Sequence, residues 1–154
     1  MSFQTTPGGT RGARVPGPNA VTRAIMRVMI SWHRRSGDKL QGHDLLYLST
    51  VGAKTGQKRQ CAVARFPDGE NAWLVVASAA GSAHHPAWYH NMAAHPDQVW
   101  IEFGGRRTRV TPVQLDSGAR AQAWQRITQA QPRYASYQQK TDRVLPVIRL
   151  TRAD

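Results

Sequence analysis

The 154-residue sequence contains one cysteine and few acidic residues: nine Asp and Glu stand against 21 Lys and Arg, a formal net charge of +12. A lone Cys61 excludes an intramolecular disulfide and any metal cluster that needs several thiolates. We therefore expect a reducing compartment. The excess of positive charge predicts an anionic partner, a description that covers nucleic acid, a membrane surface and a phosphorylated ligand.

The sequence also lacks a long uninterrupted apolar segment. Residues 71–96 contain no Asp, Glu, Lys or Arg, but Gly81, Pro86, Asn91 and four histidines interrupt them, so no membrane-spanning helix is expected there. The first eighteen residues have no apolar core of the kind that a signal peptide needs. We expect a soluble, cytoplasmic protein, with association to the cytoplasmic face of a membrane as the alternative.

The chain organisation we predict is a leader followed by one domain. Pro and Gly punctuate residues 1–18, which indicates a flexible leader, and residues 19–154 form the single domain. The domain begins with an amphipathic helix over about 20–35, whose arginines lie away from its apolar face. We favour packing of this helix on its own domain; binding to an anionic membrane surface is the other interpretation.

Beyond Gly42 the hydrophobic period falls to two or to short apolar runs, which indicates strands. Turn residues at 67–71 and 104–105 predict hairpins, and hairpins imply antiparallel pairing. The fold class is therefore mostly β, of the α+β type: about six antiparallel strands in a small barrel with peripheral helices. The predicted strands are Leu45–Val51, Arg59–Phe66, Trp73–Ala77, Val99–Phe103, Arg107–Leu115 and Val144–Leu150, and the predicted helices are Pro86–Ala94 and Ser117–Gln131.

The loop Thr50–Arg59 concentrates hydrogen-bond donors and positive charge. It contains Gly52 and Gly56 together with Lys54 and Lys58. Glycine turns can form concave sites of backbone N–H groups, and neighbouring cations add charge-assisted hydrogen bonds to phosphate. The spacing is not that of a P-loop, so hydrolysis of a nucleoside triphosphate is not expected. An ordinary basic hairpin is the alternative interpretation.

Four of the six histidines lie between residues 84 and 95. His85, His90 and His95 are five residues apart, which places them about 140° apart around a helix, so they do not converge on a metal ion. We expect no metal site. Trp88 and Tyr89 predict either the wall of a pocket for a planar ligand or core aromatics, and the residues alone favour the core.

Two further groups carry weaker signals. Tyr134 and Tyr137 are three residues apart and can share a helical face, where a phenol can donate a proton. A basic strand surface that could bind single-stranded nucleic acid is offered by Arg106, Arg107 and Arg109. The alternating arginines of this segment are also typical of a solvated edge strand, which is the interpretation we favour.

Four segments taken together are more specific than any one of them. They are GAKTGQKR at 52–59, DGENAWLVVAS at 68–78, HPAWYHNMAAHP at 85–96 and RYASYQQKTDRVLPVI at 133–148. In this order the chain resembles the deazaflavin (coenzyme F420)-dependent nitroreductase family over about residues 44–150. The resemblance implies a split β-barrel that binds reduced coenzyme F420 and transfers its hydride to a quinone, a nitroaromatic compound or another electron-poor acceptor.

The resemblance also implies residue roles. The acceptor side would be formed by Tyr134 and Tyr137, with Ser78 or Tyr134 polarising the acceptor oxygen, and these three are the catalytic candidates. The residues that match the family's coenzyme contacts are Ala53, Lys54, Thr55, Arg59, Gln60, Cys61, Ala62, Val63, Ala64, Val76, Ala77, Ser78, Ala79, Ala87, Trp88, Tyr89, His90, Asn91 and Tyr134.

Three positions depart from the family pattern. Ala79 stands where members can carry a lysine, Gln131 replaces a tyrosine, and Ala64 replaces an aromatic residue near the acceptor. The departures imply an open acceptor site that suits quinones better than bulky nitroimidazole compounds. The alternatives are an FMN-binding protein on the same barrel and a non-enzymatic binder of nucleic acid or membrane. We expect a monomer or homodimer that does not bind nucleic acid.

Overall fold

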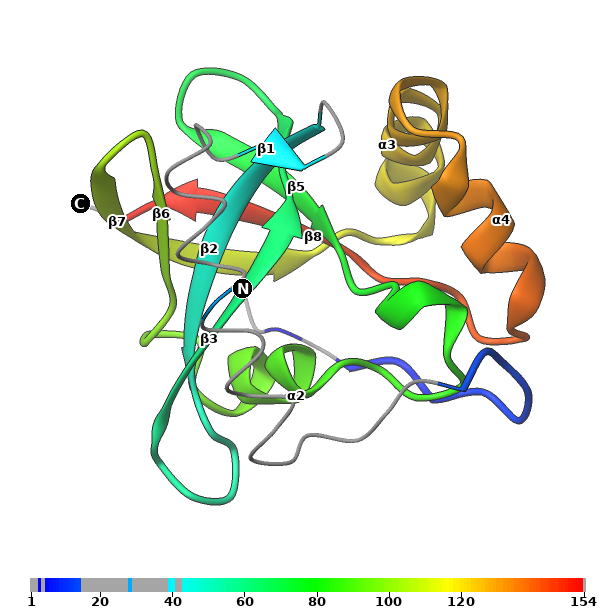
Figure 1. Ribbon diagram of the computed structural model, residues 1–154, viewed down its shortest axis with the longest axis horizontal. Helices are drawn as coiled ribbons and strands as arrows, with labels where there is room; N and C mark the ends of the chain where they lie inside the picture. Colours follow the sequence, from blue (N-terminus) through cyan, green and yellow to red (C-terminus); the bar gives the residue numbers. More distant parts are fainter. Residues whose placement is uncertain (1–2, 4, 15–27, 29–38, 41–42, 154) are drawn as a thin grey trace.

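The computed structural model describes residues 3, 5–14, 28, 39–40 and 43–153. Their main body is a curled antiparallel sheet with α3 and α4 at one end and α2 beneath it (Figure 1). The strand order is β1-β2-β6-β7-β8-β5-β4, and β3 also pairs with β2. The elements are β1 Lys39–Leu40, β2 His43–Val51, β3 Lys58–Ala64, β4 Phe66–Pro67, β5 Ala72–Val76, the short 3₁₀ helix η1 Ala79–Gly81, α2 Ala87–Ala94, β6 Trp100–Phe103, β7 Arg106–Gln114, α3 Ser117–Ala130, α4 Arg133–Lys140 and β8 Val147–Arg152.

These elements confirm the predicted fold class, an antiparallel split-barrel arrangement with helices at its periphery. The two-residue turn between β6 and β7 forms where expected, because Gly104 and Gly105 both adopt positive φ angles, of 60° and 73°. The helix predicted at Ser117–Gln131 is α3, and the Asp116 side chain caps it by accepting a hydrogen bond from Ala119 N at 2.8 Å.

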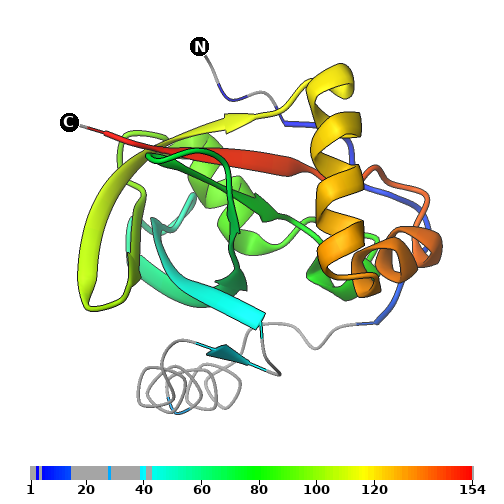
Figure 2. The same cartoon turned by 90° about the horizontal axis from the view of Figure 1, so that it is seen from above.

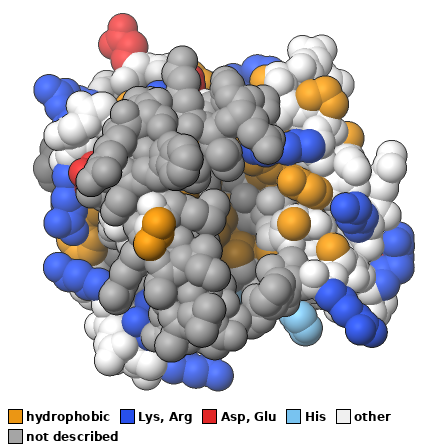
Figure 3. Space-filling view, in the orientation of Figure 1, with side chains coloured by type: hydrophobic (Ala, Val, Ile, Leu, Met, Phe, Trp, Pro, Cys, Tyr) orange, Lys and Arg blue, Asp and Glu red, His pale blue; other side chains and the backbone are white. Residues whose placement is uncertain are grey.

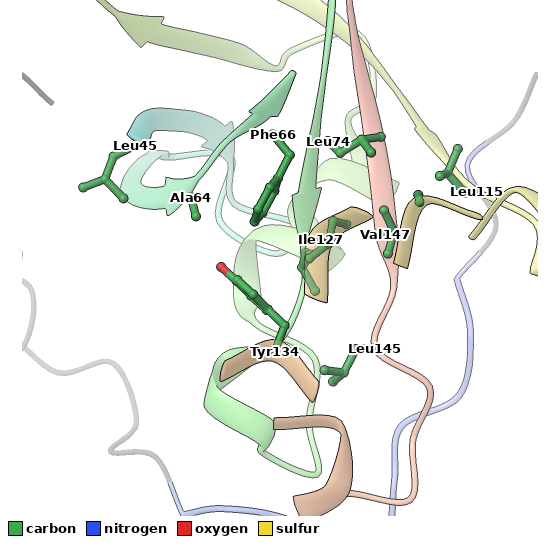
Figure 4. Packing of buried hydrophobic residues seen from close by; sticks show 11 residues of the cluster. Leu45, Ala64, Phe66, Leu74, Leu115, Ile127, Tyr134, Leu145 and Val147 are labelled. Atoms are coloured by element: carbon green, nitrogen blue, oxygen red, sulfur yellow. The ribbon is translucent and has the colours of Figure 1, made fainter. Parts of the chain in front are cut away.

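Alternation along the strands divides the buried residues into two clusters. Leu46 and Leu48 point into the barrel, while Leu45 points to the opposite side. The barrel cluster consists of Leu46, Leu48, Val75, Ala77, Tyr89, Met92, Val99, Ile101, Val110, Ile148 and Leu150. The second cluster lies where the sheet meets α3 and α4 and is shown in Figure 4; it consists of Leu45, Ala64, Phe66, Leu74, Val76, Leu115, Ala123, Ile127, Tyr134, Leu145 and Val147.

The prediction of one continuous strand over Arg59–Phe66 is wrong. Pairing of β3 with β2 ends at Ala64, and Phe66–Pro67 pairs instead with β5. The hairpin predicted between the second and third strands is therefore only two residue pairs long, and β5 pairs mainly with β8. At Arg65 the chain leaves the part of the sheet that contains β2 and enters the part that contains β5. Such a change of partners forms a corner, which allows the sheet to curl.

Two other boundaries differ from the sequence prediction. The segment Arg133–Lys140 forms a separate helix, α4, which begins after Pro132, where a proline is well tolerated because the first helical N–H groups need no partner. The last strand begins at Val147 and not at Val144. The residues between α4 and β8 are held by the Gln138 side chain, which donates to Arg143 O and accepts from Leu145 N.

The amphipathic helix predicted at 20–35 lies outside the described residues apart from Val28. Residues 5–14 of the predicted leader lie against the domain beside α4 and the approach to β8 (Figure 2). Gly9 N donates to Ala83 O at 2.8 Å, and the Asp142 carboxylate accepts from Thr10 N at 2.8 Å. A domain boundary at residue 18 stays a prediction. Among the described residues, no helix has the length and apolar character to cross a membrane.

Candidate functional site

Strand β3 joins two different environments. Its first residue, Lys58, is exposed and Arg59 is half-buried, whereas its last residue, Ala64, is buried beside the second cluster. Seven residues of β strand span about 20 Å. Ala62 and Ala64 share the face that meets the second cluster, so this face of β3 is lined by small apolar side chains.

Two further predicted contacts on this strand face the barrel interior. Cys61 and Val63 pack against the barrel cluster. Burial raises the pKa of the Cys61 thiol to about 12, so the side chain is a neutral thiol at physiological pH. It acts as a small apolar residue, and Gln60 is exposed at the cationic end of the strand.

The loop between β2 and β3 presents its cations to solvent. Gly52 N donates to Gln57 O at 2.8 Å and Gly56 N donates to Gly52 O at 2.9 Å, and Gly56 has a φ of 69° that favours glycine. These bonds close a tight turn. Lys54 and Thr55 are exposed on it. An exposed turn of this kind can hold an anionic group without first breaking an internal ion pair.

Helix α2 anchors this turn through one side chain. Asn91 is buried, and its Oδ1 accepts from Ala53 N at 2.9 Å while its Nδ2 donates to Thr50 Oγ1 at 3.2 Å. Both bonds cross the fold between residues about forty positions apart. Asn91 therefore fixes the loop's position against the barrel, a role that its place in the sequence does not reveal.

The rest of the predicted contact segment on α2 divides by burial. Ala87 and His90 are exposed and Trp88 is half-buried against the barrel cluster. Tyr89 is fully buried, and its hydroxyl accepts from Thr6 N at 2.9 Å and donates to Gln114 Oε1 at 2.6 Å. Tyr89 is thus a core residue, as the residues alone favoured.

Tyr134, on α4, lies beside the buried end of β3. Its hydroxyl end points toward Ala64 (Figure 4), and its ring meets Phe66 edge-on, with centroids 5.8 Å apart. The rings of Tyr134 and Tyr137 also meet edge-on, with centroids 5.6 Å apart. Burial raises the pKa of the Tyr134 phenol, and the nearby Arg133 charge opposes the shift without reversing it. The hydroxyl is therefore protonated at neutral pH and able to donate.

The segment after β5 approaches the same region. Val76 belongs to the cluster that contains Tyr134, while Ala77 points into the barrel. Ser78 is half-buried, and Ala79 and Ala80 that follow have positive φ angles of 44° and 54°. Two consecutive alanines in this left-handed region are strained, so surrounding contacts must hold them.

His85 takes part in a network within the protein. Its Nδ1 accepts from Arg143 Nη1 at 3.0 Å, which leaves the proton on Nε2, and Nε2 donates to Thr6 O at 2.8 Å. His85 is thus a neutral side chain with both nitrogens bonded. Across the part of the chain that the structure describes, no group of three His, Cys, Asp or Glu side chains lies close enough together to hold a metal ion.

Cationic and apolar side chains share one face of the molecule (Figure 3). Lys and Arg side chains lie around much of its rim, and apolar side chains reach the surface beside the residues drawn in grey (Figure 3). This combination suits a ligand with a flat apolar part and an anionic part. The fold and the site together define a split-barrel protein of the class that binds a planar, anionic redox cofactor.

The chain belongs to the F420H(2)-dependent quinone reductase family, whose model matches residues 21–152. It is accordingly an F420H2-dependent oxidoreductase with coenzyme F420 as its cofactor. An F420H(2)-dependent quinone reductase of Mycobacterium tuberculosis strain H37Rv is 44% identical over 110 residues, which cover 70% of this chain and 72% of the relative. A second protein of that strain, described as a putative F420H(2)-dependent quinone reductase, is 36% identical over 67% of this chain and 85% of its own length.

Solved structures agree with this assignment. An F420-H2 dependent reductase is 34% identical and superposes with a TM-score of 0.62 over 69% of this chain and 92% of its own. A protein described as a domain-swapped dimer is 30% identical, with a TM-score of 0.63 over 85% and 99% of the two chains. HutZ, a heme storage protein from Vibrio cholerae, shares the fold alone, at 16% identity and a TM-score of 0.55 over 84% and 91%.

Replacing Asn91 by Ala should loosen the β2–β3 turn. The change removes two hydrogen bonds and leaves Ala53 N–H and the Thr50 hydroxyl without these partners, which costs about 1–3 kcal/mol. We expect the free energy of unfolding to fall by that amount in chemical denaturation and the Kd for coenzyme F420 to rise. Asn71→Ala makes the same change at an exposed turn position and should alter neither quantity. Equal effects of the two substitutions would contradict the anchoring role.

His85 should make the stability of the protein depend on pH. Burial holds its pKa below the ordinary value of 6.5, and the charges of Arg143 and His90 act in the same direction. As the pH falls below about 6.5, the unfolded chain binds a proton that the folded protein does not, so stability is lost until the pH passes the folded pKa. The difference in Tm between the wild type and His85→Gln should therefore be largest near pH 8 and shrink on acidification. A difference that stays constant from about pH 5 to 8 contradicts this.

Proposed function

We propose that this protein is a quinone reductase that uses reduced coenzyme F420 as its hydride donor. The observation that carries the proposal is the arrangement along β3: the exposed Lys58 and the cationic loop before it at one end, small apolar side chains between, and the protonated Tyr134 hydroxyl at the other end. A cofactor with a flat ring and an anionic tail matches this order of environments. The family model and the Mycobacterium tuberculosis relatives, which are described as quinone reductases, support quinones as acceptors.

The residues present fit the coenzyme in chemical terms. Its tail carries a phosphodiester and glutamate carboxylates, which Lys54, the Thr55 hydroxyl and Arg59 would bind through charge-assisted hydrogen bonds. The ring would lie against β3 over residues 60–64, with residues 76–79 opposite. When bound, the coenzyme supplies a hydride from its deazaflavin ring. The protein's task is to hold donor and acceptor together and to exclude water.

Tyr134 has the properties of the proton donor. Negative charge develops on a quinone oxygen as the quinone accepts a hydride, and a neutral phenol can stabilise that oxygen and donate its proton. A phenol is protonated at neutral pH, and burial raises the pKa of Tyr134 further, so the proton is present at the start of the reaction. Ser78 is the second candidate for contact with the acceptor oxygen. Nitroaromatic compounds would be secondary acceptors.

The proposed function is tested by titrating the full chain with F420H2, FMN and single-stranded DNA at about 150 mM salt, where loose electrostatic binding is strongly weakened. We expect saturable binding of F420H2 and oxidation of the bound coenzyme when menadione is added. A nitroaromatic acceptor should be reduced more slowly. Binding of FMN or DNA without binding of F420H2 overturns the proposal in favour of the corresponding alternative, and reduction of the nitroaromatic compound alone overturns the choice of quinone.

Replacing Tyr134 by Phe should lower kcat for menadione by about 10²-fold, because a positioned general acid contributes at least that factor. The Kd for the coenzyme should change little, since the substitution removes one hydroxyl oxygen and keeps the ring contacts with Phe66 and Tyr137. The measurement is steady-state reduction of menadione beside a coenzyme titration. Unchanged turnover removes the proton-donor role from Tyr134.

A further inference from the structure

The Arg143 guanidinium is the most densely bonded side chain in the described part of the fold that has no role so far. Arg143 is almost completely buried, 3% exposed, in the segment between α4 and β8. Its Nη1 donates to Ala77 O at 3.0 Å, its Nη2 donates to Ser78 O at 2.7 Å and its Nε donates to Ser82 O at 2.7 Å. The remaining partner is the neutral His85 ring.

These bonds converge on one short piece of backbone. Ala77, Ser78 and Ser82 enclose η1, in which Ala79 and Ala80 hold left-handed conformations that L-residues rarely adopt. The N-cap residue Ser78 makes no side-chain bond that would stabilise this turn. The planar fork of a guanidinium fixes several oxygens in one geometry, which a compact ammonium does not do. Arg143 therefore stabilises the strained backbone of residues 77–82 through its three hydrogen bonds to carbonyl oxygens of this segment.

The site around Arg143 is closed on its other sides. His85 links it to Thr6, and Gly9 N donates to Ala83 O, so residues 5–14 cover the turn from outside. The Gln138 side chain donates to Arg143 O at 2.7 Å and fixes the arginine's own backbone to α4. The side chain is thus rigid on both its main-chain and guanidinium ends, as a positioning element must be.

We infer that Arg143 is a positioning residue for coenzyme binding, which acts by holding the segment Val76–Ala79 in the conformation that packs against the deazaflavin ring. The inference rests on the proposed function, because that function places this segment opposite β3 in the coenzyme site. Arg143 touches neither the coenzyme nor the acceptor in this role. The effect that tests this role is on coenzyme affinity.

The test compares Arg143→Lys with Arg149→Lys. Arg149 is the control, because it lies on β8 near Arg143 in the chain and its Nε donates to a side chain, Asp68 Oδ2 at 2.6 Å, and not to the backbone of residues 77–82. The readouts are Tm, the Kd for oxidised coenzyme F420 measured by calorimetry without turnover, and the KM values for coenzyme and menadione. We expect both variants to lose Tm, but only Arg143→Lys to raise the coenzyme Kd and KM, by about tenfold.

Several outcomes overturn the inference. A folded Arg143→Lys protein with the wild-type coenzyme Kd does so, and so does an equal rise in Kd for Arg149→Lys. If Arg143→Lys does not fold, the variant His85→Leu is measured in its place. This substitution removes the imidazole that accepts from Arg143 Nη1 and leaves the three bonds to carbonyl oxygens. The coenzyme Kd of His85→Leu should rise about threefold, and an unchanged Kd overturns the inference. Failure of the proposed function is distinguishable, because the wild type itself would then not bind the coenzyme.

Discussion

The hydrogen bonds of the buried Arg143 guanidinium are the interaction on which the packing of the segments around the site most depends. A buried charge is costly unless hydrogen bonds compensate it, and here three carbonyls and a neutral imidazole accept from four of the five guanidinium N–H groups. Those partners come from the turn after β5, from the segment before α2 and, through His85, from residues near the N-terminus. One side chain thus joins segments that are about 60 to 140 residues apart in the chain.

The second organising feature is the division of β3 between two environments. Because side chains alternate along a strand, Cys61 and Val63 belong to the barrel interior while Ala62 and Ala64 line the opposite face. The exposed Lys58 stands at one end of that face, next to the loop that carries Lys54, and Tyr134 lies near the other end. No Lys or Arg occurs from residue 66 to residue 105, a range that includes β5 and α2. The charge of +12 is therefore distributed in a way that suits a small anionic cofactor with an apolar ring.

Much of the fold could be predicted because its signals are local. The Gly104-Gly105 hairpin, the strands with a period of two and the α3 helix follow from turn chemistry and periodicity, and the structure confirms them. The break at Arg65 was missed, because a short run of apolar residues does not reveal that a strand changes partners part of the way along. The separate helix α4 was not among the predicted elements, although Tyr134 and Tyr137 were expected to share a helical face, since it has only eight residues and follows a proline.

The candidate site divides in the same way. The cationic loop, the two tyrosines and the family were recognisable from residue types in order along the chain, and family membership is confirmed. The roles of Asn91, His85 and Arg143 were not recognisable, since each depends on partners that are tens of residues away. The residue order alone determined the family, the cofactor and most strands, because these follow from local pattern and motif. Only the tertiary structure decided which polar side chains hold the site together, because burial and hydrogen bonding between distant segments exist only once the sheet has curled and brought them into contact.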